Sequence, residues 1–584
     1  EYDDAALFVV SRIGGEGYDL PRTMKNEDGS AVTGANAEDH YLELDNYEKA
    51  LLSAVCGAFE NVIVIVNSSA SMELGFLEDD TYGGKIKAAL WVGSPGGTGM
   101  NALGNILTGK VNPSGRLVDT YVRDFTATPS YANFSTNFSE LGDTYLLNGA
   151  KQEAHFVEYE EGIYVGYRYY ETRGFTDGEQ WYDENVVYPF GYGLSYADFT
   201  WSVGSVRIGD DKETATELTE NAVLSSADKN KTIFVDVTVK NNDSSIMAGK
   251  DVVQLYFTAP YIDGEVEKSH VVLGDFAKTD LLQPGDEDTV TLELRLSDTA
   301  SYDYNDANTN GEKTYEADGE TFEGYVLRIG RNAHDSWASG SWSFGYTLEE
   351  DFIYDTDSAT GHEVGNLFDD VSGHIGQYLS RSAWDDTFPT MPDPDGTETT
   401  AEIIDGLTMD AYIGAGDELD EGKKWYNATR PRQQRTELSR DETEVMLYDL
   451  IGLDYEDKLW DRLLNQLTVR QMCDLVGTGN FNTMAIDNID KPKTIDPDGP
   501  AGFTNFMTAI DAVAVVYDTC FYAGECVVGA TWNKDLAYDM GVAVGNESLA
   551  GNERDDGRPY SGWYAPAVNI HRSQFGGRNW EYYS

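Results

Sequence analysis

The stretch "NVIVIVNSS" at residues 61–69 is a continuous apolar run, the pattern of a strand that is covered on both faces. A similar run, "AALFVV" at 5–10, precedes it, and "IKAALWVG" at 86–93 follows it. Between the first two runs lies "NYEKALLSAVCGAF" (46–59), whose apolar residues recur at helical spacing. Strands that alternate with helices are typical of a parallel sheet with flanking helices, so we expect residues 1–200 to form an α/β sandwich domain.

The pattern changes between residues 201 and 350. Apolar side chains alternate along "TIFVDVTVKN" (232–241), and "DVVQLYF" (251–257) and "TVTLELRL" (289–296) behave similarly. Period-two strands separated by turns such as "PGD" indicate an antiparallel β-sandwich of the fibronectin type III or immunoglobulin kind.

The remainder of the chain divides into two parts. Residues 351–440 are acidic and rich in Pro, Gly, Asp and Thr, which favours a connector lying over the surface. From 441 the strand–helix rhythm returns, with a helical pattern at 535–550 and a strand-like run, "GWYAPAVNI", at 562–570. Because a (β/α)8 barrel needs about 250 residues, we interpret 441–584 as the first half of a TIM-type barrel. The expected fold class is therefore α/β and multi-domain.

The charge of the chain argues against two classes of partner. Its 584 residues include 41 Lys and Arg against 102 Asp and Glu, which gives a formal net charge of −61. Such a surface repels phosphate groups, so we expect neither nucleic acid nor membrane as a partner. The four cysteines and seven histidines show no metal-ligand spacing, and no apolar run approaches the ~18 residues that span a bilayer.

Several stretches scattered over the chain resemble glycoside hydrolase family 3, the β-glucosidase family. They are "SRIGGEGYDL" (11–20), "WVGSPGGTGMNALGNILTGKVNPSGRL" (91–117), "YPFGYGLSY" (188–196), "DGPAGF" (498–503), "TWNKDLAYDMGVAVGNE" (531–547) and "APAVNIHRSQFGGRNWEYYS" (565–584). The resemblance implies an α/β sandwich, a fibronectin-like domain and a barrel. Here the sandwich comes first and the barrel last, an inverted order that a minority of the family has. Against the family pattern, both ends look incomplete.

The resemblance gives Glu16, in the loop "GGEG", a catalytic role. Retaining glycosidases place two carboxyl groups across the scissile bond, roughly 5–5.5 Å apart. The family match implies that Glu16 is the acid/base and that the nucleophile is a barrel aspartate beyond Ser584. The neighbouring glycines would permit unusual turns and a close approach to a sugar. Taken alone, the loop also fits a solvated glutamate in a connection between a strand and a helix.

Two more residues match the family's substrate pocket. The resemblance implies that Asp498 accepts hydrogen bonds from hydroxyls of the non-reducing sugar and that Arg578 points into the same pocket. Asp498 also fits an ordinary turn before Gly-Pro, and Arg578 also fits a structural pair with Glu581. Many relatives carry an Arg six residues after the Asp, where this chain has Thr504, so the preferred sugar is in doubt.

Three further residues near the end of the chain are candidates for a functional role. We interpret His571 and Arg572 as structural supports. Trp580 fits a core role better than stacking on a sugar.

The sequence therefore predicts a retaining exo-β-glycosidase, with β-glucosidase the favoured activity. It would release terminal β-D-glucose from oligosaccharides or glucosides in a cleft between domains. Such hydrolysis needs no metal or cofactor. The sequence leaves open whether the protein forms a homodimer. The alternatives are a β-xylosidase or another exo-glycosidase of the family, a phosphorylase, or a carbohydrate-binding relative without catalysis.

Overall fold

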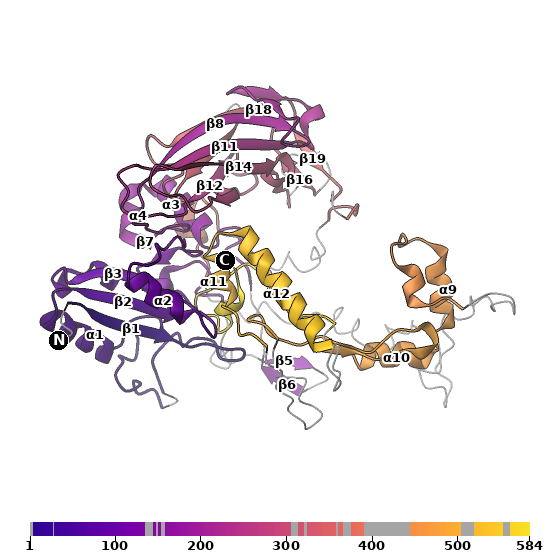
Figure 1. Ribbon diagram of the computed structural model, residues 1–584, viewed down its shortest axis with the longest axis horizontal. Helices are drawn as coiled ribbons and strands as arrows, with labels where there is room; N and C mark the ends of the chain where they lie inside the picture. The colour runs from indigo at the N-terminus through magenta and orange to yellow at the C-terminus, as the bar shows by residue number, and fades with distance from the viewer. Residues whose placement is uncertain are drawn as a thin grey trace.

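A computed structural model of the chain describes most of its residues. These are 4–26, 28–134, 144–147 and 150–153 (backbone only), 158–304, 306, 313–319, 324–357, 360–365, 375–390, 444–479, 481–503, 519–552 and 561–583. In Figure 1 the N-terminal sheet, a β-sandwich and the C-terminal segment with α11 (Glu525–Gly529) and α12 (Lys534–Asn552) come together. Helices α9 (Lys458–Gln466) and α10 (Val469–Gly477) lie apart from them (Figure 1).

The apolar runs near the start of the chain form a parallel sheet, as predicted. Its strands are β1 (Ala6–Arg12), β2 (Val62–Ser68) and β3 (Ile86–Trp91), in the order β1-β2-β3. Helix α1 (Asn46–Ala58) connects β1 to β2 and begins at a capping box made by Asp45 and Glu48, which satisfies free backbone N–H groups. Helix α2 (Met100–Leu107) follows β3.

Shorter elements complete the N-terminal region. They are β4 (Tyr121–Val122), β5 (Thr144–Leu147), β6 (Ala150–Glu153), α3 (Tyr167–Asp177), α4 (Glu179–Asn185) and β7 (Val186–Tyr188). Strand β4 pairs with β7, and β5 pairs with β6. A core rich in aromatic residues holds this part, and Phe125 and Tyr164 are fully buried in it.

The second region is a two-sheet β-sandwich, again as predicted. One sheet has the order β10-β18-β17-β12-β13 and the other β14-β11-β8-β9. Their bounds are β8 (Phe199–Gly209), β9 (Thr216–Glu217), β10 (Ala222–Leu224), β11 (Thr232–Asn241), β12 (Val252–Thr258), β13 (Val272–Lys278), β14 (Glu287–Arg295), β17 (Tyr325–Gly330) and β18 (Trp342–Leu348). Every second residue of β11 from Ile233 to Val239 is fully buried between the sheets, because side chains of a strand alternate between its faces. A small sheet of β15 (Ser301–Tyr302), β16 (Tyr315–Ala317) and β19 (Phe352–Tyr354) adjoins it.

The described part of the connector packs against the N-terminal region. Its helix α6 (Trp384–Thr387) begins with a buried Trp384, whose ring lies 4.8 Å from that of Tyr164 and 5.5 Å from that of Tyr169, centroid to centroid. Trp384 Nε1 donates a hydrogen bond to Thr176 Oγ1 at 2.8 Å. Residues 375–390 are thus held by the α3 segment of the N-terminal region.

The C-terminal region differs in detail from the sequence expectation. It has α9 to α12 and a two-stranded antiparallel sheet of β20 (Asn482–Thr483) and β21 (Thr494–Ile495). The run 562–570, expected to be a strand, forms a single parallel bridge between Asp498 and Tyr564. Pro566 lies in the middle of this run and has no backbone N–H to donate to a neighbouring strand. The half-barrel stays a prediction.

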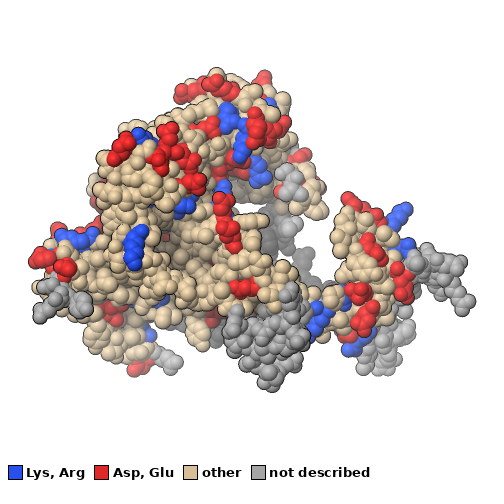
Figure 2. Space-filling view, in the orientation of Figure 1, with Lys and Arg blue, Asp and Glu red and all other residues tan. Residues whose placement is uncertain are grey.

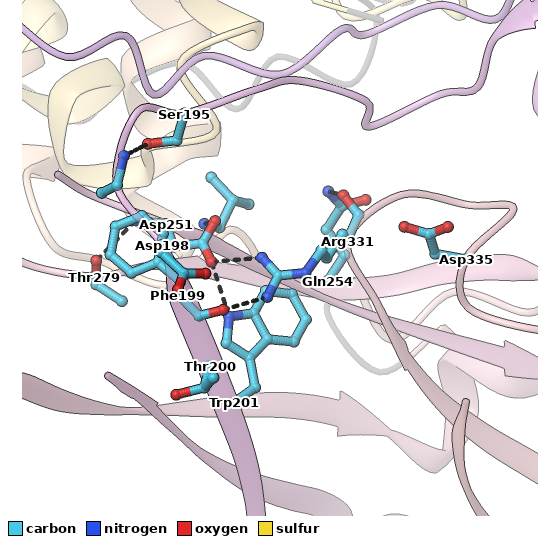
Figure 3. A network of polar contacts seen from close by, with 12 residues as sticks. Ser195, Asp198, Phe199, Thr200, Trp201, Asp251, Gln254, Thr279, Arg331 and Asp335 are labelled. Carbon is cyan, nitrogen blue, oxygen red and sulfur yellow. Dashed lines mark hydrogen bonds and ion pairs between the residues drawn. The ribbon is translucent and has the colours of Figure 1, made fainter. Parts of the chain in front are cut away.

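A buried carboxylate joins the N-terminal region to the β-sandwich. Figure 3 shows this carboxylate, that of Asp251, with Trp201 and Arg331. Asp251, 1% exposed, accepts a hydrogen bond from Arg116 Nη2 at 2.7 Å. Its other oxygen accepts from Trp201 Nε1 at 2.8 Å and Arg331 Nη1 at 3.1 Å. The Arg331 guanidinium lies over the Trp201 ring, 4.4 Å from its centroid. Because Arg116 is itself buried, this network fixes the two regions against each other.

The C-terminal region is anchored at the same junction. Trp532 is buried between Phe190 and Phe276, with ring centroids 5.2 and 5.0 Å away, and its Nε1 donates to the Arg116 carbonyl at 3.2 Å. Lys278 Nζ donates to the Thr531 carbonyl at 2.6 Å.

The charged residues on the surface and the polarity of the helices agree with the composition. On the face shown in Figure 2, Asp and Glu side chains gather over the β-sandwich and on the α9 segment, with Lys and Arg scattered among them. Among the described residues, no helix combines the length and apolar character that crossing a membrane would need.

Candidate active site

The loop that carries Glu16 begins at a firmly held strand end. Arg12, the last residue of β1, makes two hydrogen bonds of 2.8 Å to the carboxylate of Glu48 on α1. Beyond it, Gly15 and Tyr18 form an isolated bridge that closes a turn, in which Gly17 has a φ of +75°. That conformation favours glycine. Glu16 therefore stands at the tip of a tight turn, with its side chain 66% exposed.

Arg578 and Asp498 come from two separate segments of the C-terminal region. Asp498 follows β21, is half-buried and takes part in the parallel bridge with Tyr564. Arg578 precedes a short 3-10 helix, Asn579–Glu581. Its guanidinium pairs with Glu581 through hydrogen bonds of 2.9 Å from Nε and 2.6 Å from Nη2. The structural pair considered for Arg578 is thus present, and the pair holds the guanidinium in one orientation.

One cavity of about 480 Å³ brings these residues together. Glu16, Asp498 and Arg578 all line it, although they come from opposite ends of the chain. The other lining residues are Phe481, Pro500, Trp563, Tyr564, Ala565, Pro566, Ala567 and Glu581. The volume falls in the range of roughly 300–1,000 Å³ that small-molecule sites occupy.

The charges around this cavity come mainly from carboxylates. Glu16, Asp498 and Glu581 face one guanidinium, that of Arg578, whose Nη1 lies 3.6 Å from Glu16 Oε1. The hydrogen bonds and the charge of Glu581 raise the pKa of Arg578 above its ordinary value. Carboxylates accept hydrogen bonds and a guanidinium donates them, so the cavity can bind a ligand with many hydroxyl groups.

Aromatic side chains supply the apolar part of the cavity. Trp563 donates a hydrogen bond from Nε1 to the Gly499 carbonyl at 2.7 Å, which fixes the indole beside the turn that follows Asp498. Tyr564 and Phe481 pack edge to face at 4.9 Å. A lining that combines aromatic and acidic groups suits a ligand with one apolar and one polar surface. Sequence reasoning missed Trp563, Tyr564 and Phe481 as lining residues, because only the bridge between distant segments brings them to Asp498.

A buried carboxyl group lies near Ala567 and Glu581, two of the residues that line the cavity. Glu525, the first residue of α11, is fully buried, and neither of its oxygens has a hydrogen-bond partner among the described residues. Burial raises the pKa of Glu525 to about 8, and the nearby charge of Glu581 acts in the same direction, while the backbone of Ala567 opposes it. Glu525 is therefore a neutral acid near neutral pH.

His571 and Arg572 connect the C-terminal segment to the N-terminal region. His571 Nδ1 lies 2.8 Å from Asp119 Oδ1, and Ser71 donates to the other oxygen of that carboxylate at 2.8 Å. Arg572 pairs with the buried carboxylate of Glu161 through two hydrogen bonds. These contacts are those of structural supports. Trp580 is not among the residues that line the cavity, and Thr504 lies outside the described residues.

Three side chains of the types that bind metal ions lie close together and form hydrogen bonds. Within the described ranges, His40, Glu43 and Glu73 bring their ligand atoms within 4.8 Å of one another. The Leu42 N–H donates to His40 Nδ1 at 3.2 Å, so the proton of the neutral ring lies on Nε2, 2.9 Å from Glu73 Oε1. A metal ion would need the lone pair of that nitrogen.

Comparison with known proteins identifies the domains. The model of the glycosyl hydrolase family 3 C-terminal domain matches residues 1–167, and that of the fibronectin type III-like domain matches residues 251–317. Beta-glucosidase A of Butyrivibrio fibrisolvens is 30% identical over 612 aligned residues, which cover all of this chain and 63% of that protein. A beta-glucosidase of Ruminococcus albus is 30% identical over 349 residues, or 60% of this chain and 29% of that protein.

One solved structure supports the fold over nearly the entire chain. A beta-glucosidase of Paenibacillus barengoltzii has a TM-score of 0.66 at 24% identity and covers 99% of this chain. This chain covers 52% of that one. The chain thus spans about half to two thirds of the length of the two relatives that it matches from end to end.

Proposed function

We propose that this chain belongs to glycoside hydrolase family 3 and is part of a retaining exo-β-glycosidase, specifically a β-glucosidase. One observation carries the proposal: Glu16, Asp498 and Arg578 line the same cavity. The relatives named above are beta-glucosidases. Substrates would be oligosaccharides or glucosides with a terminal β-D-glucose.

The geometry supports a division of labour between the two regions. In this proposal Asp498 accepts hydrogen bonds from hydroxyls of the terminal sugar, and Arg578, held by Glu581, donates to others. Glu16 protonates the glycosidic oxygen as the bond breaks and then takes a proton from water. In a retaining mechanism a second carboxylate attacks the anomeric carbon.

We also propose the domain division that the sequence suggested. Residues 1–200 would be the α/β sandwich, 201–350 the fibronectin-like domain, 351–440 the connector and 441–584 the first half of a TIM-type barrel. The parallel bridge between Asp498 and Tyr564 supports the half-barrel, because neighbouring barrel strands pair in parallel. In this arrangement the active site lies where the sandwich loop meets the barrel.

Exchange of Glu16 for glutamine in the full-length protein tests this function. We expect Glu16→Gln to reduce kcat on cellobiose at least about 100-fold, the lower range for loss of a general acid. Hydrolysis of an activated aryl glucoside should lose less at the glycosylation step, and added azide should restore turnover by replacing water in deglycosylation. Glu220→Gln, an exposed glutamate of the β-sandwich, is the matched control.

Two further measurements separate the alternatives. A panel of nitrophenyl glycosides distinguishes glucose from xylose preference, and a sugar phosphate formed in added phosphate would identify a phosphorylase. Unchanged kinetics of Glu16→Gln on cellobiose would refute the role of Glu16. Binding of cellobiose by a protein that hydrolyses no glycoside would favour the non-catalytic relative.

A further inference from the structure

The loop of Glu16 is fastened to the segment of Arg578 by one hydrogen bond between backbones and one from a backbone N–H to a side-chain carboxylate. Leu20 N donates to the Phe575 carbonyl at 2.7 Å, and Gly577 N donates to Asp19 Oδ1 at 2.9 Å. Asp19 and Leu20 belong to the loop of the N-terminal region, whereas Phe575 and Gly577 immediately precede Arg578. Two regions that are remote in sequence thus share hydrogen bonds next to both functional side chains.

Glycines allow these backbones to touch. A Cβ atom on Gly14 would lie 2.7 Å from the Gly577 carbonyl oxygen, and a Cβ on Gly577 would lie 2.3 Å from the carbonyl oxygens of Gly15 and Tyr18. Such distances are too short for any side chain. Neither Gly14 nor Gly577 has a positive φ, unlike Gly17, so these two positions require glycine for space and not for conformation.

Glu16 itself has little else to fix it. Its carboxylate is mostly exposed, and the 3.6 Å to Arg578 Nη1 is longer than a hydrogen bond. The position of the carboxylate therefore depends on its backbone. Glu16 lies two residues from Gly14 and three from Asp19, both of which contact Gly577, and Gly577 adjoins Arg578.

We propose that Gly14, Asp19, Leu20, Phe575 and Gly577 form an interdomain clasp that sets where Glu16 stands relative to the sugar held by Arg578. Asp19 is the positioning residue of the clasp, because it is the clasp residue whose side chain hydrogen-bonds to the backbone of the other segment, at Gly577. The proposal rests on the proposed function, in which Glu16 delivers a proton to the leaving group. A displacement of about 1 Å in such a group can cost on the order of 100-fold in rate.

Leaving-group dependence distinguishes this role from general support. Asp19→Ala removes the acceptor of the Gly577 amide, and Gly577→Ala inserts a methyl group between the two backbones. For both variants we expect kcat/KM on cellobiose to fall by about 10- to 100-fold, whereas kcat/KM on an activated dinitrophenyl glucoside, which reports the glycosylation step and needs no proton on its leaving group, should fall less than about threefold. In Asp19→Ala, KM for cellobiose should change little, since Asp498 and Arg578 remain in place.

Two variants serve as controls. Asp19→Asn keeps an oxygen that can accept the Gly577 N–H and should recover most of the activity on cellobiose. Gly541→Ala, at an exposed position of α12 where a Cβ would meet nothing within 4 Å, should leave both substrates unaffected. Asp19 is exposed, so its variants test the clasp even where Gly577→Ala fails to fold.

Hydrogen exchange tests the clasp without catalysis. In Asp19→Ala we expect faster exchange of the Gly577 and Leu20 amides, with the amides of β11 unchanged. A wild-type protein without glycosidase activity would refute the proposed function, while this exchange result would still decide the clasp. Unchanged exchange at Gly577, or equal losses on both substrates, would overturn the positioning role of Asp19.

Discussion

The positive charge on His334 stabilises the folded protein, and this stabilisation is lost as the pH becomes alkaline. His334 lies between β17 and β18, where Nδ1 is 3.0 Å from Glu171 Oε2 and Nε2 is 3.1 Å from Glu179 Oε1. Its ring stacks on Tyr182 at 3.8 Å. Burial alone would lower the pKa of His334, but the hydrogen bonds and charges of the two glutamates outweigh it and raise the pKa to about 9.

The magnitude and sign follow from linkage. The unfolded histidine titrates near 6.5. The difference of roughly 2.5 between the two pKa values corresponds to roughly 3 kcal/mol of unfolding free energy. Since the folded value is the higher one, this stabilisation is complete below pH 6.5, declines as pH rises from 6.5 to 9, and is absent above. It acts at the junction between α3, α4 and the β-sandwich.

The measurement is urea unfolding of wild type and His334→Gln between pH 6 and 9.5. We expect the wild type to exceed the variant by more at pH 6 than at pH 9.5, with the gap narrowing by roughly 3 kcal/mol. The control is His362→Gln, at an exposed histidine outside this junction, whose curve should follow that of the wild type. Parallel curves for wild type and His334→Gln would refute the reasoning.

Three further predictions concern the buried residues Glu525, Asp251 and Trp532. Glu525→Gln should stabilise the protein by a few kcal/mol at pH 8 and little at pH 4.5. The reason is that the pKa of this carboxyl group is 4.5 in the unfolded chain and about 8 in the folded one, so the wild type loses stability between these pH values. Urea unfolding at both pH values measures the difference. Asp251→Asn should cost about 3–5 kcal/mol in the same assay, since it leaves the buried Arg116 without its counter-charge, whereas Arg331→Met, at a half-exposed partner, should cost about 1 kcal/mol or less. Trp532→Ala should cost about 3–5 kcal/mol and expose the C-terminal region to limited proteolysis before the β-sandwich, and simultaneous cleavage of both regions would contradict the anchoring role of Trp532.

Local patterns located the elements whose burial is regular along the chain. The run at 61–69 became β2, the largely buried central strand of its sheet, and the alternation at 232–241 became β11 in the core between two sheets. Helix 46–59 was predicted from the helical spacing of Tyr47, Leu51, Ala54 and Val55, although the side chains that the helix buries are those of Leu52 and Cys56. In each case one short stretch carries the whole signal, so no distant partner was needed.

The candidate site was predicted in part, by resemblance to a family, and its remaining residues became apparent only from the structure. Family resemblance picked Glu16, Asp498 and Arg578, and the structure places all three at one cavity. The aromatic residues that line the same cavity, Trp563 and Tyr564, escaped notice because a bridge between two distant segments, Asp498 with Tyr564, brings them there, and no periodicity encodes it. The run 562–570 was misjudged for a related reason: its apolar residues resemble a strand, but Pro566 interrupts the ladder.

The glycines of the Glu16 loop show how one short motif can meet two separate demands. Gly17 allows the turn that presents Glu16, which is a matter of φ, while Gly14 is required because another backbone occupies the space where its side chain would be. The second demand is reciprocal, since Gly577 needs the absence of a side chain for the same reason. In the proposed clasp, the close approach of the two backbones and the hydrogen bond from the Gly577 N–H to the Asp19 carboxylate together hold the loop of Glu16 against the segment of Arg578. That arrangement fixes the backbone of the loop and leaves the exposed side chain of Glu16 free to adjust to the leaving group.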